Sequence, residues 1–311
     1  MQYCMDKIVC KLCAKKFEDD SDFHKHLKSH KLTQTEYYQT HYPRFDRYDG
    51  SIIKYKNKEY YFNSEFNSKN NFKRWLSSVS PIVGRQYVVD FLISRKNKKN
   101  LIFAPTQVEL RTLMMPGIKY INDKLGGYQK ICEQIGLKSR FIKNSLDVSL
   151  LKDITNKVIF ADTREQMPLD FDNTTRTKGM SYGDYRMSGS NVFIERKSAG
   201  DAWGTLIGGF ERFEREIVRA KEANSYLIVL VECSFSELEG FPLQRQVRGK
   251  IKAPVEFVYR NIRYLLQKYD HIQFLFVENR EEASRVVQKI FSIDEQVKEV
   301  DLQYLYDIKN L

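Results

Sequence analysis

The sequence predicts a mixed α/β fold with a central sheet, preceded by a small ββα unit and a mainly helical basic region. Three observations support this prediction. Regularly spaced cysteines and histidines open the chain, helical periodicity dominates its middle, and apolar strand-like runs alternate with helical segments in its second half. We therefore expect four segments, at residues 1–45, 46–150 and 151–295, with a C-terminal tail at 296–311.

Composition indicates an intracellular protein with substantial hydrophobic cores. Of the 311 residues, 42% are hydrophobic and 13% aromatic, which is enough for two or more domains. No stretch is apolar enough to cross a membrane, and the polar, charged start does not resemble a signal peptide. Five cysteines, two of them in one Cys-x-x-Cys pair, indicate reduced thiols with one metal site. We expect a cytoplasmic, nucleoid-associated protein encoded by a prokaryote or a phage.

Charge is distributed unevenly along the chain. The net charge is +11, and residues 1–150 contain 27 Lys and Arg against 15 Asp and Glu, which gives +12. The remainder is therefore near neutral, at −1. A basic excess confined to one segment is typical of a module that grips DNA, so we expect DNA as the partner and no membrane association.

The first motif is that of a C2H2 zinc finger, with the spacing Cys-x2-Cys-x12-His-x3-His. The expected zinc ligands are Cys10, Cys13, His26 and His30. Ile8, Phe17 and Phe23 lie where the small core of a finger needs them, whereas His24 would change the spacing. Such a unit cannot bury enough surface alone, so zinc must supply folding energy. A finger can bind DNA, RNA or protein, and the motif does not select among them.

Helical signals follow the finger. Thr33 is expected to cap a short helix, and the segment around it resembles an extension found after single zinc fingers in bacterial and phage DNA-binding proteins. Residues 52–62 suggest a small hairpin, and residues 71–140 are expected to be helical. The last short helices of this region are expected at 105–113, 117–125 and 127–135. The Gly-Gly-Tyr-x-x-Ile-x4-Gly-Leu pattern there is similar to helical repeats appended to homing endonucleases.

Acidic residues follow apolar strands in the second half of the chain. One such strand ends in Asp162, and a hairpin is expected to bring Asp184 beside Glu195. Side chains alternate along a strand, so Glu195 and Lys197 project to one face and Arg196 to the other. Converging carboxylates can hold a hard divalent cation, and a neighbouring lysine can contact an anionic substrate or a water nucleophile.

These residues resemble the signature of the XPF family of structure-specific nucleases, a branch of the PD-(D/E)XK fold. The signature is Gly-Asp, a variable hairpin and Glu-Arg-Lys-x-x-x-Asp, preceded by Asp-x-Arg-Glu, and the resemblance covers about residues 155–293. It implies a sheet of PD-(D/E)XK nuclease type, with Mg²⁺ or Mn²⁺ bound by Asp162, Asp184 and Glu195. Lys197 would orient or activate water. The supporting active-site residues would be Arg196, Asp201 and Glu165.

The segments after the motif fit the same fold. The expected elements are helices around 201–220, 257–266 and 283–291, and strands at 226–231 and 272–277. Residues 254–291 allow two interpretations, which are ordinary core and a homodimer interface within the nuclease domain. The interface candidates are Phe257, Ile262 and Leu266.

Together these features predict a metal-dependent DNA endonuclease that hydrolyses phosphodiester bonds. XPF-family members usually continue into a helix-hairpin-helix module that grips branched DNA, and only residues 292–311 follow the motif here. The finger and the helical region therefore favour a site-specific enzyme of homing or phage type. The first alternative is a structure-specific flap or junction endonuclease. The second is a non-catalytic DNA-binding regulator with a nuclease-like fold.

Overall fold

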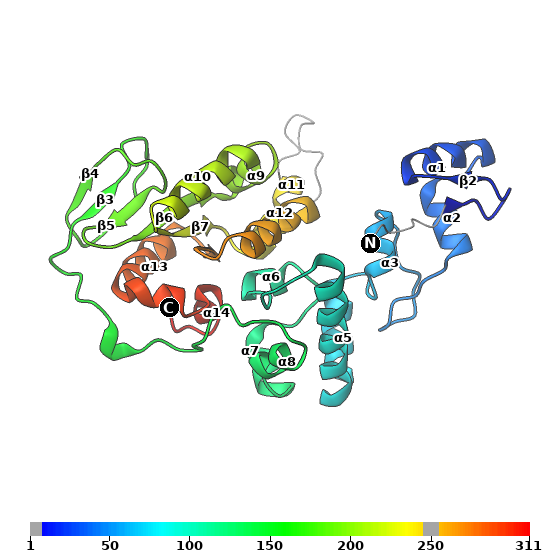
Figure 1. Ribbon diagram of the computed structural model, residues 1–311, viewed down its shortest axis with the longest axis horizontal. Coiled ribbons are helices and arrows are strands. Elements are labelled where there is room, and N and C mark those ends of the chain that lie inside the picture. Colours follow the sequence, from blue (N-terminus) through cyan, green and yellow to red (C-terminus); the bar gives the residue numbers. More distant parts are fainter. Residues whose placement is uncertain (1–7, 245–254) are drawn as a thin grey trace. The chain divides into compact units, whose positions relative to one another are not determined.

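The computed structural model describes residues 8–244 and 255–311, and the chain forms two compact units (Figure 1). The first unit runs to Ser80, and the second starts at Pro81. This division falls inside the segment expected at 46–150, whose first part groups with the finger and whose second part groups with the sheet. That the three segments expected before residue 296 act as separate domains stays a prediction.

A small antiparallel strand pair and short helices open the first unit. These elements are β1 (Ile8–Val9), β2 (Lys16–Phe17), α1 (Asp20–His26), the 3₁₀ helix η1 (Leu27–His30) and α2 (Gln34–His41). Thr33 starts α2 with a capping box, because its hydroxyl accepts the Glu36 backbone N–H and its own N–H donates to the Glu36 carboxylate. The predicted cap is therefore confirmed.

The finger shares a core with the residues that follow it. Phe23 of the finger is buried together with Tyr37 and Tyr38 of α2, and with Ile53 and Tyr61 further along the chain. The rings of Phe23 and Tyr37 lie 5.2 Å apart, edge to face. This aromatic cluster supplies the buried surface that an isolated ββα unit lacks.

Residues 52–62 do not form the expected hairpin. Their second part begins α3 (Lys58–Asn63), which Asn57 caps with its side chain. Ile52 instead forms an isolated antiparallel bridge with Phe45, upstream of the expected partner. An asparagine cap favours helix initiation, and here it outweighs the strand preference of the alternating Tyr and Lys residues.

Helices dominate the region between this core and the sheet, as predicted. They are α4 (Lys69–Ser78) in the first unit, and α5 (Pro81–Lys99), α6 (Gln107–Arg111), α7 (Ile118–Lys124) and α8 (Tyr128–Gln134) in the second. The last three lie within their expected ranges, and α7 and α8 each follow a glycine at the N-cap. Within the described ranges, no helix combines the length and the apolar character needed to span a membrane.

A six-stranded mixed sheet forms the centre of the second unit, in the order β4-β3-β5-β6-β7-β8. Its strands are β3 (Ile159–Ala161), β4 (Thr175–Thr177), β5 (Tyr185–Met187), β6 (Val192–Ser198), β7 (Tyr226–Glu232) and β8 (Ile272–Phe276). β5 is antiparallel to both neighbours, while β6, β7 and β8 run parallel. The predicted α/β fold class is confirmed. β4 escaped prediction because its three residues are polar and exposed.

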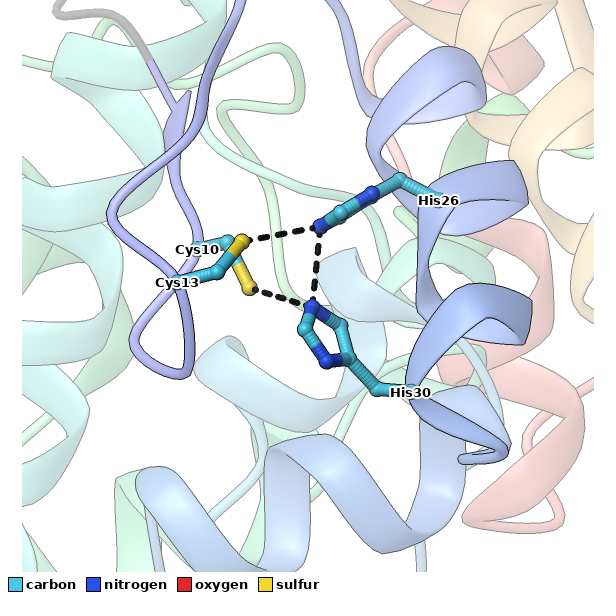
Figure 2. Close-up of side chains that lie close together, drawn as sticks. All are labelled: Cys10, Cys13, His26 and His30. Carbon is cyan, nitrogen blue, oxygen red and sulfur yellow. Dashed lines mark hydrogen bonds between the residues drawn. The ribbon is translucent and has the colours of Figure 1, made fainter.

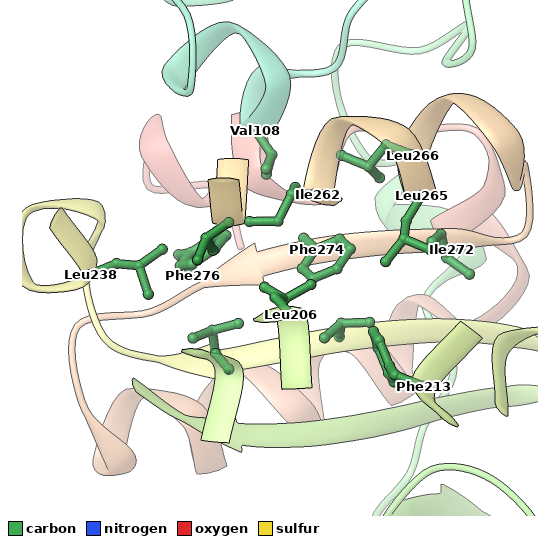
Figure 3. Close-up of a cluster of buried hydrophobic side chains, with 14 of the residues drawn as sticks. Val108, Leu206, Phe213, Leu238, Ile262, Leu265, Leu266, Ile272, Phe274 and Phe276 are labelled. Carbon is green, nitrogen blue, oxygen red and sulfur yellow. The ribbon is translucent and has the colours of Figure 1, made fainter. Parts of the chain in front are cut away.

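Helices cover both faces of the sheet (Figure 1). One face carries α9 (Ala199–Ile207), α10 (Phe210–Glu222), α11 (Phe235–Gln244) and α12 (Val255–Lys268), and the other carries α13 (Arg280–Ile293), η3 (Asp294–Lys298) and α14 (Leu302–Asp307). Val108 of α6 packs in the same apolar cluster as Ile262 and Phe274 (Figure 3). α6 is therefore part of the hydrophobic core that covers this face of the sheet.

Residues 296–311 are not a tail. Leu302 and Leu305 of α14 are fully buried against the sheet. Asp301 caps this helix, and its carboxylate also accepts the Gln107 backbone N–H at 2.7 Å. With six residues, α14 is too short to show helical periodicity in the sequence, and its burial depends on contacts with distant segments.

Two of the three dimer candidates belong to the core. Ile262 and Leu266 are 0% and 1% exposed and pack within the second unit, which confirms the core interpretation for them. Phe257, one turn earlier on α12, keeps partial exposure. Homodimerisation through the remaining surface of this domain stays a prediction.

Candidate active site and zinc site

The β5–β6 hairpin fixes the two halves of the motif to one another. Its register pairs Tyr185 with Ile194, so Asp184 lies next to Glu195, as predicted. The Asp184 backbone N–H donates to the Ile194 carbonyl at 2.7 Å, and the Asp184 carboxylate accepts the Arg196 backbone N–H at 2.7 Å. Backbone hydrogen bonds therefore set the positions of both acidic residues.

A glycine precedes Asp184 because the backbone there is left-handed. Gly183 has a φ of +69°, and a Cβ at this position would come within 3.2 Å of the Phe193 Cβ and 3.3 Å of the Ile194 carbonyl oxygen. A larger residue would push Asp184 away from β6. The Gly183 N–H also donates to the Glu216 carboxylate of α10 at 3.2 Å, which brings a further acidic residue to the hairpin.

Glu195 and Lys197 form a buried ion pair on one face of β6. The Lys197 Nζ lies 2.7 Å from the Glu195 Oε1, and the two side chains are only 11% and 9% exposed, respectively. The ammonium also lies 4.9 Å from the centre of the Phe213 ring of α10. Burial raises the pKa of Glu195 above its usual range; Lys197 opposes this shift, and the charges of Asp184 and Glu216 add to it. The predicted strand alternation is confirmed here.

Arg196 belongs to a separate ion-pair network. Its guanidinium donates to Glu232 at 2.7 and 2.8 Å, and to Glu165 at 3.2 Å. Glu232 ends β7, where the parallel register places it opposite Ser198. Glu232 could not be recognised from the sequence, since its signal is one acidic residue at the end of an apolar run.

Asp162 lies beside the hairpin, but its carboxylate is already engaged. Its backbone N–H donates to the Asp184 carbonyl at 2.8 Å. Its buried carboxylate accepts the Arg164 side chain and backbone N–H at 2.7 and 2.8 Å, and the Met180 backbone N–H at 2.7 Å. Burial alone would raise the pKa of Asp162, yet the hydrogen bonds from Arg164 and Met180 outweigh it and lower this pKa.

The structure thus brings Asp184, Glu195 and Lys197 together and turns the Asp162 carboxylate toward Arg164. Within the described ranges, only the four zinc residues meet as a group of ligand atoms within 4.8 Å of one another, so the three carboxylates do not form a closed cage. Burial also raises the pKa of Asp184. Two carboxyl groups, of which Glu195 is buried and Asp184 half-buried, lie beside a single lysine and leave an acidic excess that a bound cation would offset.

Asp201 has a local role at the start of α9. It is exposed, and its carboxylate accepts the Ser198 hydroxyl at 2.5 Å. Ser198 is the N-cap, since its hydroxyl accepts the Asp201 backbone N–H at 3.2 Å. An acidic residue in the first turn is favourable to the helix dipole. A catalytic role for Asp201 stays a prediction.

The expected zinc residues meet at one point (Figure 2). The His26 Nε2 lies 3.3 Å from the Cys13 Sγ and 3.0 Å from the His30 Nε2, which is 3.6 Å from the Cys10 Sγ. Ligand atoms around tetrahedral zinc lie about 3.3–3.8 Å apart, given bonds of ~2.0–2.3 Å. The set can therefore hold Zn²⁺, and soft thiolates with imidazoles select zinc over magnesium.

His24 takes no part in this cluster, in agreement with its spacing. Its Nε2 lies 3.0 Å from the Tyr38 hydroxyl, and burial lowers its pKa. Phe17 packs with its ring centre 4.8 Å from that of His26. Phe17 therefore packs against the end of α1 that carries His26, and His24 connects α1 to α2.

Among the solved structures that resemble this chain are two of XPF. XPF from Aeropyrum pernix is 20% identical over 45% of this chain and 68% of that chain, with a TM-score of 0.33. XPF from Aeropyrum pernix in complex with DNA is 19% identical over 43% of this chain and 63% of that chain, also with a TM-score of 0.33. No family model and no curated protein matches the sequence. The similarity is distant, and the function has to be argued from the residues of the site.

Proposed function

We propose that this chain is a metal-dependent DNA endonuclease that hydrolyses phosphodiester bonds. The observation that carries the proposal is the buried Glu195–Lys197 pair, with its 2.7 Å contact, beside Asp184 on the hairpin. Burying a carboxyl group and a lysine beside a second, half-buried carboxyl group at two inner strands is costly to stability, and such groups cluster at functional sites. Their order in the sequence is that of the XPF-family signature.

Asp184 and Glu195 would hold Mg²⁺ or Mn²⁺, because hard cations prefer carboxylate oxygens. When bound, such an ion would polarise the scissile phosphate and lower the pKa of a water molecule. Asp162 would join them when Arg164, whose side chain is 71% exposed, turns toward a DNA phosphate. Lys197 would orient the attacking water or stabilise negative charge on the phosphate in the transition state.

Arg196 would support the site from the opposite side of β6. Glu232 and Glu165 hold its guanidinium, and its backbone N–H holds the Asp184 carboxylate. The side chain therefore anchors the strand segment on which Glu195 and Asp184 depend. In this proposal Glu165 positions Arg196 and does not touch the substrate.

The N-terminal half would supply most of the DNA binding. It carries the basic excess of the chain, +12 in residues 1–150, and the zinc finger. A finger followed by a helical array favours recognition of a sequence, as in homing or phage nucleases, over recognition of a branched structure. Cleavage of a random linear duplex library, compared with cleavage of synthetic flaps and junctions, separates these two specificities.

One observation favours a second candidate function, a DNA-binding regulator without catalysis. Asp162, one of the three expected metal ligands, is fully occupied by Arg164 and by the Met180 N–H. If Arg164 does not release this carboxylate on DNA, the metal site stays incomplete.

Nicking of supercoiled plasmid in Mg²⁺ or Mn²⁺ decides between the two functions. The wild type should nick, whereas Asp184→Asn, Glu195→Gln and Lys197→Ala should lose roughly 10²- to 10⁴-fold in rate while keeping their DNA affinity. Glu222→Gln, on the exposed face of α10, is the matched control. Wild-type protein that binds DNA but nicks in neither metal would support the regulator. Full activity of Asp184→Asn would reject the assigned site.

A further inference from the structure

A tight loop in the first unit presents three large apolar side chains to solvent. Phe45 is 59% exposed, Tyr48 is 40% exposed and Ile52 is 51% exposed. Phe45 and Ile52 are partners in the antiparallel bridge, so their side chains project from the same face. We call residues 44–53 the aromatic loop. Most other aromatic residues of this unit, such as Phe23, Tyr37 and Tyr61, are buried.

Hydrogen bonds hold the aromatic loop in one conformation. The Asp46 backbone N–H donates to the Ser51 carbonyl at 2.7 Å. The buried Asp46 carboxylate accepts the backbone N–H groups of Tyr48 and Asn67 at 2.8 and 2.5 Å, and the Asn71 side-chain amide at 2.9 Å. The loop is thus preorganised, and it would lose little conformational entropy on binding. Its apolar side chains are held outward by the fold.

Basic residues outnumber acidic residues in and directly after the aromatic loop, although Asp49 within it is exposed and acidic. Lys54 and Lys56 follow it and are exposed, and Arg47 within it is 46% exposed and pairs with Glu65. Residues 1–80 contain 15 Lys and Arg against 10 Asp and Glu. This excess of positive charge attracts a polyanion such as DNA.

The area of the exposed apolar surface fits a nucleobase better than a protein partner. A fully covered aromatic side chain buries roughly 150–250 Å², so three partly exposed side chains offer on the order of 300 Å². A stable protein interface needs about 800 Å² from each partner. Stacking on a base requires only one ring face, and an aromatic platform next to cations is the usual arrangement for unpaired nucleotides.

We propose that the aromatic loop binds unpaired nucleotides of DNA, with Phe45 and Tyr48 stacking on bases. Lys54 and Lys56 contact the adjoining phosphates, and Ile52 supports the edge of the Phe45 ring. The inference rests on the proposed function in taking DNA as the partner. It adds a contact that is separate from the zinc finger and that selects opened or single-stranded DNA.

Fluorescence anisotropy with the full-length, zinc-loaded protein tests this inference in buffer without Mg²⁺ or Mn²⁺. The probes are a labelled oligothymidylate and a blunt duplex of equal length. Phe45→Ala and Tyr48→Ala should each weaken binding of the single strand by roughly 5- to 100-fold and leave duplex binding nearly unchanged. The salt dependence should not change, because the phosphate contacts remain. Tyr264→Ala removes an exposed tyrosine of α12 and is the matched control.

A further variant separates stacking from a general apolar contact. Phe45→Leu keeps the apolar bulk without a ring face, so it should resemble Phe45→Ala. Wild-type affinity in Phe45→Leu, equal losses on both DNAs, or unchanged affinity in Phe45→Ala and Tyr48→Ala would each overturn the proposal. Near-UV circular dichroism checks that the variants are folded. Since no cleavage is measured, failure here is independent of the plasmid-nicking result.

Discussion

At the scale of single residues, the site is marked by ion pairs that exclude most water. Arg196, with a side chain that is 14% exposed, is held by Glu232 with two short contacts and by Glu165 with one longer contact. Removing one partner of a buried pair leaves an uncompensated charge, at a cost of about 3–5 kcal/mol when burial is complete. We predict that Glu232→Gln lowers the free energy of unfolding by about 2–4 kcal/mol, and Glu165→Gln by less.

Urea denaturation measures both changes, and Arg196→Met completes a double-mutant cycle. In the Arg196→Met background, the loss caused by Glu232→Gln should largely disappear, because the arginine charge is no longer buried. Equal losses with and without Arg196 would show that Glu232 stabilises the fold through other contacts.

A second residue-scale prediction concerns pH. Burial raises the pKa of Glu195 in the folded chain above its unfolded value of about 4.3, so the folded state favours the protonated form. Below the unfolded pKa, the contribution of Glu195 to the free energy of unfolding is fully present. It is lost as the pH rises through the folded pKa. Glu195→Gln should therefore flatten the decline of the melting temperature of the Mg²⁺-free protein as the pH rises.

Thermal unfolding from pH 5 to 9 checks this, with about 2–4 °C expected for each kcal/mol in a unit of this size. Glu222→Gln, on the solvent-exposed side of α10, should follow the wild-type curve. A steeper decline in Glu195→Gln than in the wild type would contradict the burial argument.

The residues of the hairpin could be placed from the sequence because strand alternation and a short turn fix their faces. Asp184, Glu195 and Lys197 are neighbours for purely local reasons. Glu216 and Glu232 could not be placed, because α10 and β7 reach the site only through packing and parallel pairing across long connections. The contact between Arg164 and Asp162 was not predicted either, although the two residues are only two positions apart in the sequence.

At the scale of elements, the zinc finger and the helices after it depend on one another. Phe23 is buried with Tyr37 of α2 and with Tyr61 of α3. We predict that zinc chelation, or Cys13→Ser, increases amide hydrogen exchange in α2 and α3 as well as in the finger. DNA targeting should weaken, while the sheet and the proposed Mg²⁺-dependent cleavage should remain intact, because thiolates and carboxylates select different metals.

Loss of protection confined to residues 8–30 would show that the aromatic core holds without the metal. The sequence predicts the finger and the cap at Thr33 because both are local motifs. It misses α3, β4 and α14, whose lengths are six, three and six residues. Elements this short carry little periodicity, and distant contacts decide their conformation.

At the scale of the whole molecule, the division at Pro81 predicts which fragments fold. A fragment of residues 151–311 loses Val108 from the apolar cluster and Gln107 from its bond with Asp301. We predict that residues 81–311 unfold in one transition near that of the same unit in the full chain, whereas residues 151–311 melt several degrees lower or aggregate. Differential scanning calorimetry makes the comparison, and equal stability of the two fragments would contradict it.

The fragment of residues 81–311 also tests how DNA binding is divided between the two units. The basic excess is shared, since residues 81–150 contain 12 Lys and Arg against 5 Asp and Glu. We predict that residues 81–311 bind DNA more weakly than the full chain and with a shallower salt dependence, because fewer phosphates are neutralised. Identical affinity and slope would reject a DNA role for the first unit and favour a protein partner for its finger.

The hydrogen bonds of α6 to the C-terminal region have a consequence for the order of events during synthesis. Gln107 bonds to Asp301 and Asp307, which are made 194 and 200 positions later. The first unit can complete its contacts and take up zinc on the ribosome, whereas the second unit must wait for α14. If the chain is the endonuclease that we propose, a nascent chain can hold DNA before its cutting site is assembled, and it can break a strand only after α14 has been made.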